Sequence, residues 1–233
     1  MLVPPAAFPV TPTNLGGAGD VRSGMTTSRF GRRFLCSILA LFIGDALHAQ
    51  NARQDAADAA RLIKAMDVKP GSVVGEIGAG DGTLTIALAK AVGDTGRIYS
   101  NELNKDRLAG IRKRVDEEKL QNVTTVEGKE DVANLPDGCC DGIFMRSVYH
   151  HFGDPPSMNA SLLKALKPGG TLVVIDFTPP PGGENPPGHR GEDNHHGITQ
   201  TTLEKELKAA GFEIVSSSTA LREVFVVARR ASE

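Results

Sequence analysis

The stretch Glu76-Ile77-Gly78-Ala79-Gly80-Asp81-Gly82 decides the fold of this chain. It lies between a short apolar run, Ser72–Ile77, and a segment with apolar residues at helical spacing, Thr83–Val92. Glycines at alternate positions let the backbone turn sharply and approach a ligand closely. We therefore predict a buried strand, a glycine-rich binding loop and a helix in succession.

The spacing of the glycines and the residue before them indicate the kind of ligand. A dinucleotide-binding fingerprint has the form G-x-G-x-x-G, whereas here the third glycine comes one position early and Thr83 stands where that fingerprint needs glycine. A carboxylate at Glu76 would repel a pyrophosphate, but it suits a cationic or amine-bearing ligand. The loop therefore favours a nucleoside ligand without phosphates.

Further along the chain, short apolar runs alternate with segments of helical periodicity. Strands are expected at Arg97–Ser100, Val123–Val126, Gly142–Met145 and Thr171–Phe177, and helices at Asp106–Leu120, near Ser157–Leu166 and at Thr202–Ala210. Strand–helix units of this length predict a parallel sheet with helices on both faces. The tail differs, because Phe212–Ser217 and Val224–Ala228 are joined by a connection too short for a parallel crossover. The sheet should therefore end in an antiparallel pair.

Several motifs, in order along the chain, resemble those of class I S-adenosylmethionine-dependent methyltransferases. They are E/D-x-G-x-G-x-G after the first strand, an acidic residue at Glu102 after the second, and the later segments Asp141–Met145, Tyr149–Phe152, Leu166–Asp176 and Ala210–Phe212. The resemblance covers about residues 51–233. It implies a Rossmann-like α/β fold with a seven-stranded, mainly parallel sheet of order 3-2-1-4-5-7-6, in which the seventh strand is antiparallel.

The resemblance also implies which residues bind the methyl donor, S-adenosylmethionine. They are Glu76, Gly78, Ala79, Gly80, Gly82, Glu102, Leu103, Glu130, Asp131 and Arg146. In such a site Glu102 holds the ribose hydroxyls, and an acid after the third strand lies near the adenine amine. Lys129 stands at the usual place of that acid, so Glu130 or Asp131 must serve. Alternatively, this acidic pair stabilises the start of a helix.

Tyr149, His150 and His151 are candidate catalytic residues. A histidine near the methyl donor is able to accept a proton from the nucleophile, because its pKa lies near working pH. The alternative is structural: one histidine packs under the edge of the sheet and the other caps the next helix. Tyr-His-His recurs at this loop among family members with unlike substrates, which favours the structural role.

The segment Thr178–Thr199 is long and rich in proline and glycine. It follows the fifth strand, beside the edge where open α/β sheets bind ligands. We interpret it as a lid over the methyl acceptor, with a solvated loop as the alternative. Its histidines form a tract of a kind that binds metal, but no metal site is predicted. The adjacent Cys139 and Cys140 do not make a zinc site, and packing of Cys140 as a small apolar residue is favoured over capture of a soft ligand.

Residues 1–49 form a leader of different character. Arginines at positions 29, 32 and 33 precede the apolar run Phe34–Ile43, and small and polar residues follow. This is the layout of a secretory signal peptide or membrane anchor. Because the basic side comes first, the domain at residues 50–233 is expected to be exported, with a cytoplasmic location as the alternative. No run reaches the roughly 18 apolar residues of a membrane span, so any membrane association is expected through the leader only.

The composition of the whole chain limits its function further. With 40% apolar residues and a net charge of −2, the chain is not disordered throughout, and it does not suit a nucleic-acid binder that neutralises phosphates. We expect a methyltransferase that passes a methyl group from S-adenosylmethionine to a small-molecule acceptor by direct displacement. Two alternatives stay open: a nucleotide-dependent Rossmann oxidoreductase, and a non-catalytic S-adenosylmethionine-binding protein.

Overall fold

The computed structural model describes residues 49–192 and 195–232, so the predicted leader lies almost wholly outside the described residues. A helix covers residues 49–65. The strands are β1 (Val73–Ile77), β2 (Arg97–Glu102), β3 (Val123–Glu127), β4 (Cys140–Arg146), β5 (Leu166–Phe177), β6 (Phe212–Ala220) and β7 (Glu223–Arg230). The helices are α2 (Thr83–Val92), α3 (Lys105–Glu117), α4 (Pro155–Ala165), α5 (Gln200–Ala209) and the short 3-10 helix η1 (Tyr149–His151). None of the helices described is long and apolar enough to cross a membrane.

The strands form one seven-stranded sheet of order β3-β2-β1-β4-β5-β7-β6. Strand β1 pairs in parallel with β2 and with β4, whereas β7 runs antiparallel to β5 and β6. The predicted Rossmann-like sheet, including its antiparallel seventh strand, is confirmed. The reversal is made by Leu221 and Arg222, whose φ angles of 48° and 71° are both positive, as tight hairpin turns require.

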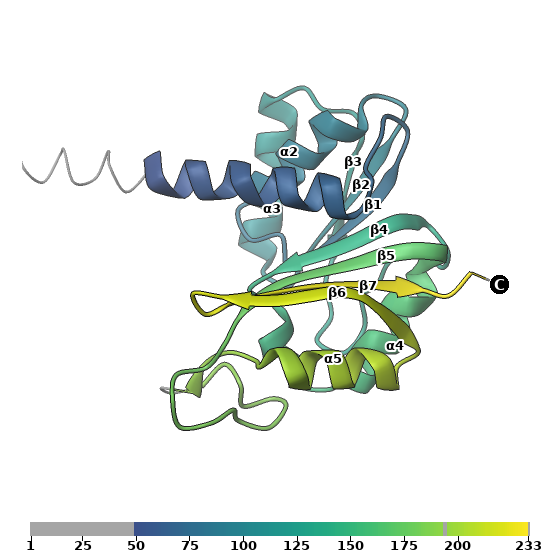
Figure 1. Cartoon of the computed structure of the whole chain (residues 1–233). Coiled ribbons are helices and arrows are strands. Elements are labelled where there is room, and N and C mark those ends of the chain that lie inside the picture. Colours follow the sequence, from purple (N-terminus) through teal and green to yellow (C-terminus); the bar gives the residue numbers. More distant parts are fainter. Residues whose placement is uncertain (1–48, 193–194, 233) are drawn as a thin grey trace, which may run out of the picture. The chain divides into compact units, whose positions relative to one another are not determined.

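Helices cover both faces of the sheet, as predicted (Figure 1). On one face, Leu62 of helix 49–65 and Leu88 of α2 belong to the same buried cluster as Phe144 of β4. On the other face, Leu162 of α4 and Leu203 of α5 belong to the buried cluster that holds the opposite side of the sheet. The central strands are therefore buried on both faces, which explains why their sequences are nearly continuous apolar runs.

Side-chain caps decide where several elements begin. The Asn104 side chain accepts hydrogen bonds from the backbone N–H groups of the first turn of α3, and Asp154 and Thr199 cap α4 and α5 in the same way.

The last strand before the long loop, β5, begins earlier than predicted, because Leu166 already pairs with Cys140 ahead of an irregularity in the register. The earlier start of β5 moves one predicted boundary by a few residues and leaves the predicted order of the elements unchanged.

The carboxyl ends of β1, β2 and β4 meet at one edge of the sheet. The backbone N–H of Ala79 donates to the carbonyl oxygen of Asn101 at 2.8 Å, which ties the glycine loop to the end of β2. The N–H of Ser147 donates to the carbonyl oxygen of Ile175 at 2.8 Å, which ties the end of β4 to β5. Open α/β sheets bind their ligands at this edge.

Candidate functional site

A cavity of about 610 Å³ opens at the carboxyl ends of β1, β2 and β4, a volume typical of small-molecule sites. We call it the main cavity. Six residues predicted to bind the methyl donor line it: Gly78, Gly80, Glu102, Leu103, Glu130 and Arg146. The lining also includes Ile77, Val148, Phe152 and Met158, so much of the wall is apolar. The structure thus brings most of the predicted binding residues together around one space.

The remaining predicted residues lie beside this cavity rather than in its wall. Glu76 and Ala79 line a smaller pocket of about 170 Å³, which shares Gly78, Gly80 and Arg146 with the main cavity. Asp131 lines a neighbouring shallow pocket, so Glu130 is the better placed of the acidic pair. Gly82 precedes α2 with a φ of 79° and packs against Ile111, where a Cβ would come within 3.0 Å.

The glycine loop needs its glycines for two different reasons. Gly78 has a φ of 69°, and a Cβ on it would lie 2.5 Å from the Val148 side chain. Gly80 also has a positive φ, 59°, but a Cβ there would meet nothing within 4 Å. The first glycine therefore lets the loop pack against the segment after β4. The second glycine has no side chain, so the space next to the loop backbone stays open for a ligand.

Glu102 holds the glycine loop in place from the end of β2. Its carboxylate accepts hydrogen bonds from the backbone N–H of Gly80 at 2.8 Å and from that of Asn104 at 2.9 Å. The residue is only 5% exposed, yet it lines the main cavity. A carboxylate offers about four lone-pair positions, so two remain for a ligand's hydroxyl groups.

Glu76 is a buried carboxyl group beneath the loop. It is 3% exposed and accepts a short hydrogen bond from the Thr85 hydroxyl, which also contacts Ser100. Burial raises the pKa of Glu76 to about 8, although Thr85 and the nearby Arg146 guanidinium oppose this shift. The carboxyl group is therefore able to hold a proton near neutral pH and to lose it when a cation arrives.

Glu76→Gln is expected to remove a pH dependence of folding stability. Because the native pKa is raised from 4.5 to about 8, the folded protein keeps a proton that the unfolded chain loses between these values. The free energy of unfolding of the wild type should therefore fall as pH rises through this window, by an amount on the order of a few kcal/mol. Thermal unfolding of both proteins across the window measures the difference, and identical pH profiles would contradict the prediction.

Arg146 joins the end of β4 to the helix over residues 49–65. Its guanidinium pairs with Asp55 at 2.6 Å and with the buried Asp58 at 3.1 Å. Burial lowers the pKa of Arg146, but these two carboxylates outweigh burial and raise the pKa above its usual value. Asp55 and Asp58 were not singled out from the sequence, because nothing local marks a carboxylate that meets its partner about ninety residues later in the chain.

Comparison with known proteins supports the same assignment. Residues 75–174 match the model of a family described as a methyltransferase domain. A ubiquinone/menaquinone biosynthesis C-methyltransferase from Shewanella halifaxensis is 31% identical over 119 residues, which are 51% of this chain and 47% of that protein. The chain therefore spans about half the length of the curated relatives it matches.

Solved structures agree with this match. An S-adenosylmethionine-dependent methyltransferase from Aquifex aeolicus superimposes with a TM-score of 0.64 at 24% identity, covering 75% of this chain and 90% of that one. A geranyl diphosphate C-methyltransferase from Streptomyces coelicolor A3(2), in complex with Mg²⁺, geranyl diphosphate and S-adenosyl-L-homocysteine, gives 0.65 at 13% identity, covering 77% and 82%. Residues 75–174 therefore match a methyltransferase domain, and the described residues share the fold of S-adenosylmethionine-dependent methyltransferases. This match opposes the oxidoreductase alternative, which the glycine spacing also disfavours.

The three candidate catalytic residues of this methyltransferase domain lie in different environments. His151 is exposed and lines the main cavity. His150 is 1% exposed and faces away from it: its Nδ1 contacts Asp176 at 2.7 Å, and its Nε2 lies 2.6 Å from Nε2 of His196. Burial lowers the pKa of His151, and the neighbouring histidines add to this effect. Of the two adjacent histidines, His151 is the one placed to meet a substrate in the cavity.

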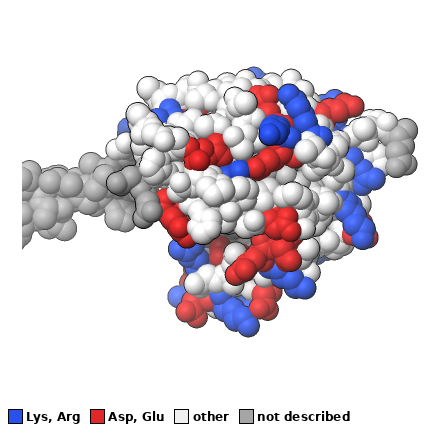
Figure 2. Space-filling view, turned by 90° about the horizontal axis from the view of Figure 1, so that it is seen from below, with Lys and Arg blue, Asp and Glu red and all other residues white. Residues whose placement is uncertain are grey.

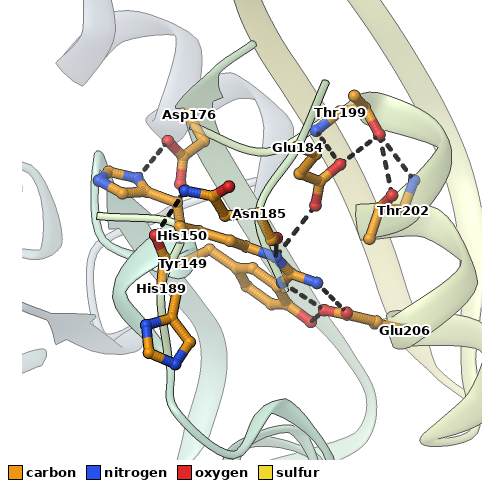
Figure 3. Close-up of polar contacts among 10 residues, drawn as sticks. Tyr149, His150, Asp176, Glu184, Asn185, His189, Thr199, Thr202 and Glu206 are labelled. Carbon is orange, nitrogen blue, oxygen red and sulfur yellow. Dashed lines mark hydrogen bonds and ion pairs between the residues drawn. The ribbon is translucent and has the colours of Figure 1, made fainter. Parts of the chain in front are cut away.

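Tyr149 is part of a buried polar network away from the cavity (Figure 3). It is fully buried, and its hydroxyl contacts Asn159 at 2.6 Å and Glu206 at 3.1 Å. Burial raises the pKa of Tyr149 far above its usual value. The structure therefore places Tyr149 in the core and not in the wall of the main cavity.

Arg190 joins the loop over residues 178–199 to helix α5. This side chain is 3% exposed and pairs with Glu184 at 3.0 Å and with Glu206 of α5 at 2.5 Å. Gly188 reaches the wall of the main cavity, and a Cβ on Gly191 would lie 2.6 Å from the His151 ring. The described part of the loop therefore packs along one side of the cavity, as a lid requires.

Cys139 and Cys140 lie at the opposite edge of the sheet from the cavity. They form a disulfide between adjacent residues, which was not predicted from the sequence. Cys140 is fully buried, as expected for a small apolar residue in the core. Because β4 begins at Cys140 and the cavity lies at its other end, the pair does not belong to the main cavity.

Proposed function

We propose that this protein transfers a methyl group from S-adenosylmethionine to a small-molecule acceptor. The observation that carries the proposal is the main cavity, whose wall is built from the glycine loop, Glu102 and the end of β4. In this arrangement Glu102 accepts hydrogen bonds from the ribose, and the bare backbone at Gly80 lets the donor lie close to the loop. Leu103, which is 55% exposed, offers an apolar surface to the adenine.

The transfer needs alignment more than chemical activation. The sulfonium donor already carries a good leaving group, so the protein holds the acceptor atom in line with the methyl carbon and keeps water away. The acceptor's electron pair forms the new bond while the carbon–sulfur bond breaks, giving S-adenosylhomocysteine. His151 lies at the cavity wall, where it is placed to take a proton from the acceptor.

We infer that the acceptor is a small and largely apolar molecule. The cavity wall carries the apolar side chains of Val148, Phe152 and Met158. The curated relatives are named for ubiquinone and menaquinone biosynthesis, which is consistent with such an acceptor. On the face seen in Figure 2, acidic and basic side chains are mixed rather than gathered into a basic stripe, and this favours a small molecule over a nucleic acid.

Two measurements on the full chain test this proposal. Calorimetry should detect one S-adenosylhomocysteine bound per chain, and labelled donor should pass its methyl group into a small-molecule extract. Failure to bind would overturn the proposal. Binding without transfer to any fraction of the extract would instead identify a non-catalytic S-adenosylmethionine-binding protein.

We also propose that the domain is exported, as the leader pattern of residues 1–49 suggests. Because S-adenosylmethionine is made in the cytosol, an exported enzyme would need a separate supply of its donor. Fractionation of cells that carry the chain with a C-terminal tag tests the location. Recovery of the full-length protein in the cytosolic fraction alone would contradict export.

A further inference from the structure

Three histidines from two distant segments meet beside the main cavity. His150 and His151 belong to η1 after β4, and His196 comes from the loop after β5. One ring nitrogen of each lies within 4.8 Å of those of the other two. The closest pair, the Nε2 atoms of His150 and His196, is 2.6 Å apart. Three imidazoles that converge in this way form a set of neutral nitrogen ligands.

A buried carboxylate fixes the orientation of the central histidine. Asp176, which is 2% exposed, contacts Nδ1 of His150 at 2.7 Å and also accepts from the His150 backbone N–H at 3.2 Å (Figure 3). A carboxylate cannot donate, so Nδ1 of His150 donates to Asp176, and its Nε2 faces His196. In the neutral ring Nε2 then carries the lone pair that a metal ligand needs. Histidines that bind metals are held in this way, with the second ring nitrogen donating to a carboxylate.

We propose that His150, His151 and His196 form a binding site for one divalent transition-metal ion of the Zn²⁺ type. Imidazole nitrogen suits zinc and its neighbours better than calcium or magnesium, which prefer oxygen ligands. Three histidines leave one position open on a tetrahedral ion. In the metal-free protein the facing Nε2 atoms of His150 and His196 share one proton, and the ion replaces that proton.

The proposed metal site lies next to both the main cavity and the loop over residues 178–199. His151 also lines the main cavity, so the open position on the ion lies near the space that we assign to donor and acceptor. His196 belongs to the loop over residues 178–199, so the ion would bind this loop to the end of β4. The proposal does not depend on methyl transfer, because metal binding is measured without donor or acceptor.

Calorimetric titration of the untagged full chain with Zn²⁺ tests the site. We expect one ion per chain with a Kd of about 10 μM or lower. His196→Ala should weaken binding at least about tenfold, and Asp176→Asn should weaken it by about 10–100-fold, because the His150 ring loses its orientation. His189→Ala is the matched control: this histidine lies on the same loop, its side chain is 63% exposed, and among the described contacts that side chain pairs only with Glu192.

The outcomes separate the metal site from a simple histidine hydrogen bond. Tight binding that is lost in His196→Ala and kept in His189→Ala supports the site, as does a rise in thermal stability with Zn²⁺ in the wild type alone. No binding by the wild type, or equal affinity in all these variants, overturns it. Thermal unfolding of each metal-free variant shows that lost binding does not come from lost folding.

Discussion

Replacing Gly80 with arginine is expected to weaken S-adenosylhomocysteine binding by about 100-fold or more, which corresponds to about 2.7 kcal/mol. Gly80 lines the main cavity, and a Cβ built on it meets no protein atom within 4 Å. The new side chain would therefore occupy the space that we assign to the donor. The φ of 59° adds a further cost, because side chains other than glycine rarely adopt this conformation.

Gly110→Arg is the matched control for this variant. Gly110 lies in α3 and is exposed, and a Cβ added to it would likewise meet nothing within 4 Å. The same change of charge and size there should leave donor affinity within about twofold, since Gly110 is not among the residues that line the cavity. Calorimetry on both variants makes the comparison. Undiminished binding by Gly80→Arg would show that the donor lies elsewhere.

Replacing Arg190 with methionine is expected to lower the free energy of unfolding by about 3–5 kcal/mol. Arg190 is 3% exposed and forms a two-pronged ion pair with Glu206, as well as an ion pair with Glu184. Removal of the guanidinium leaves these carboxylates without a cation in a poorly hydrated place. The loop over residues 178–199 should loosen at the same time, and the rate of methyl transfer should fall with it.

Chemical denaturation of this variant and of a surface control measures the effect. Arg112→Ala is the control, because Arg112 is an exposed arginine of α3 that donates only to the Thr125 hydroxyl among the described contacts, and its loss should cost under about 1 kcal/mol. Adding Glu206→Gln to Arg190→Met should restore part of the lost stability, since it removes one unpaired charge. If the double variant is less stable than Arg190→Met, the cost comes from packing and not from the unpaired carboxylates.

The predictions that succeeded depended on patterns within short windows of sequence. The glycine loop after Ile77 requires close backbone approach, and Glu76 and Glu102 stand at the carboxyl ends of β1 and β2, which meet in a parallel sheet. The short connection between the predicted strands Phe212–Ser217 and Val224–Ala228 excludes a parallel crossover, so the antiparallel last pair was also predictable. The glycine loop and the antiparallel last pair are therefore predictable from nearby residues and from the lengths of the connections.

Partners far apart in the chain were beyond prediction. Tyr149 was a candidate for proton transfer, but the structure buries it in the core, where its hydroxyl contacts Glu206. The Tyr-His-His motif gives no sign of this, because its neighbours in space come from α5 and from the loop before it. Likewise, the approach of His196 to His150 was not predicted, because 46 residues separate them.

The sequence by itself determined the alternation of strands and helices, the antiparallel last pair and the loop at the end of β1, because backbone freedom, apolar periodicity and connection length are local properties. The order of the strands in the sheet was implied by the family resemblance. Only the tertiary structure decided which polar side chains share a site. It set Glu76 in a buried place that raises its pKa, brought Arg146 to Asp58, and gathered the three histidines beside the cavity. Burial and charge pairing depend on distances through space, and the folded sheet alone fixes those distances.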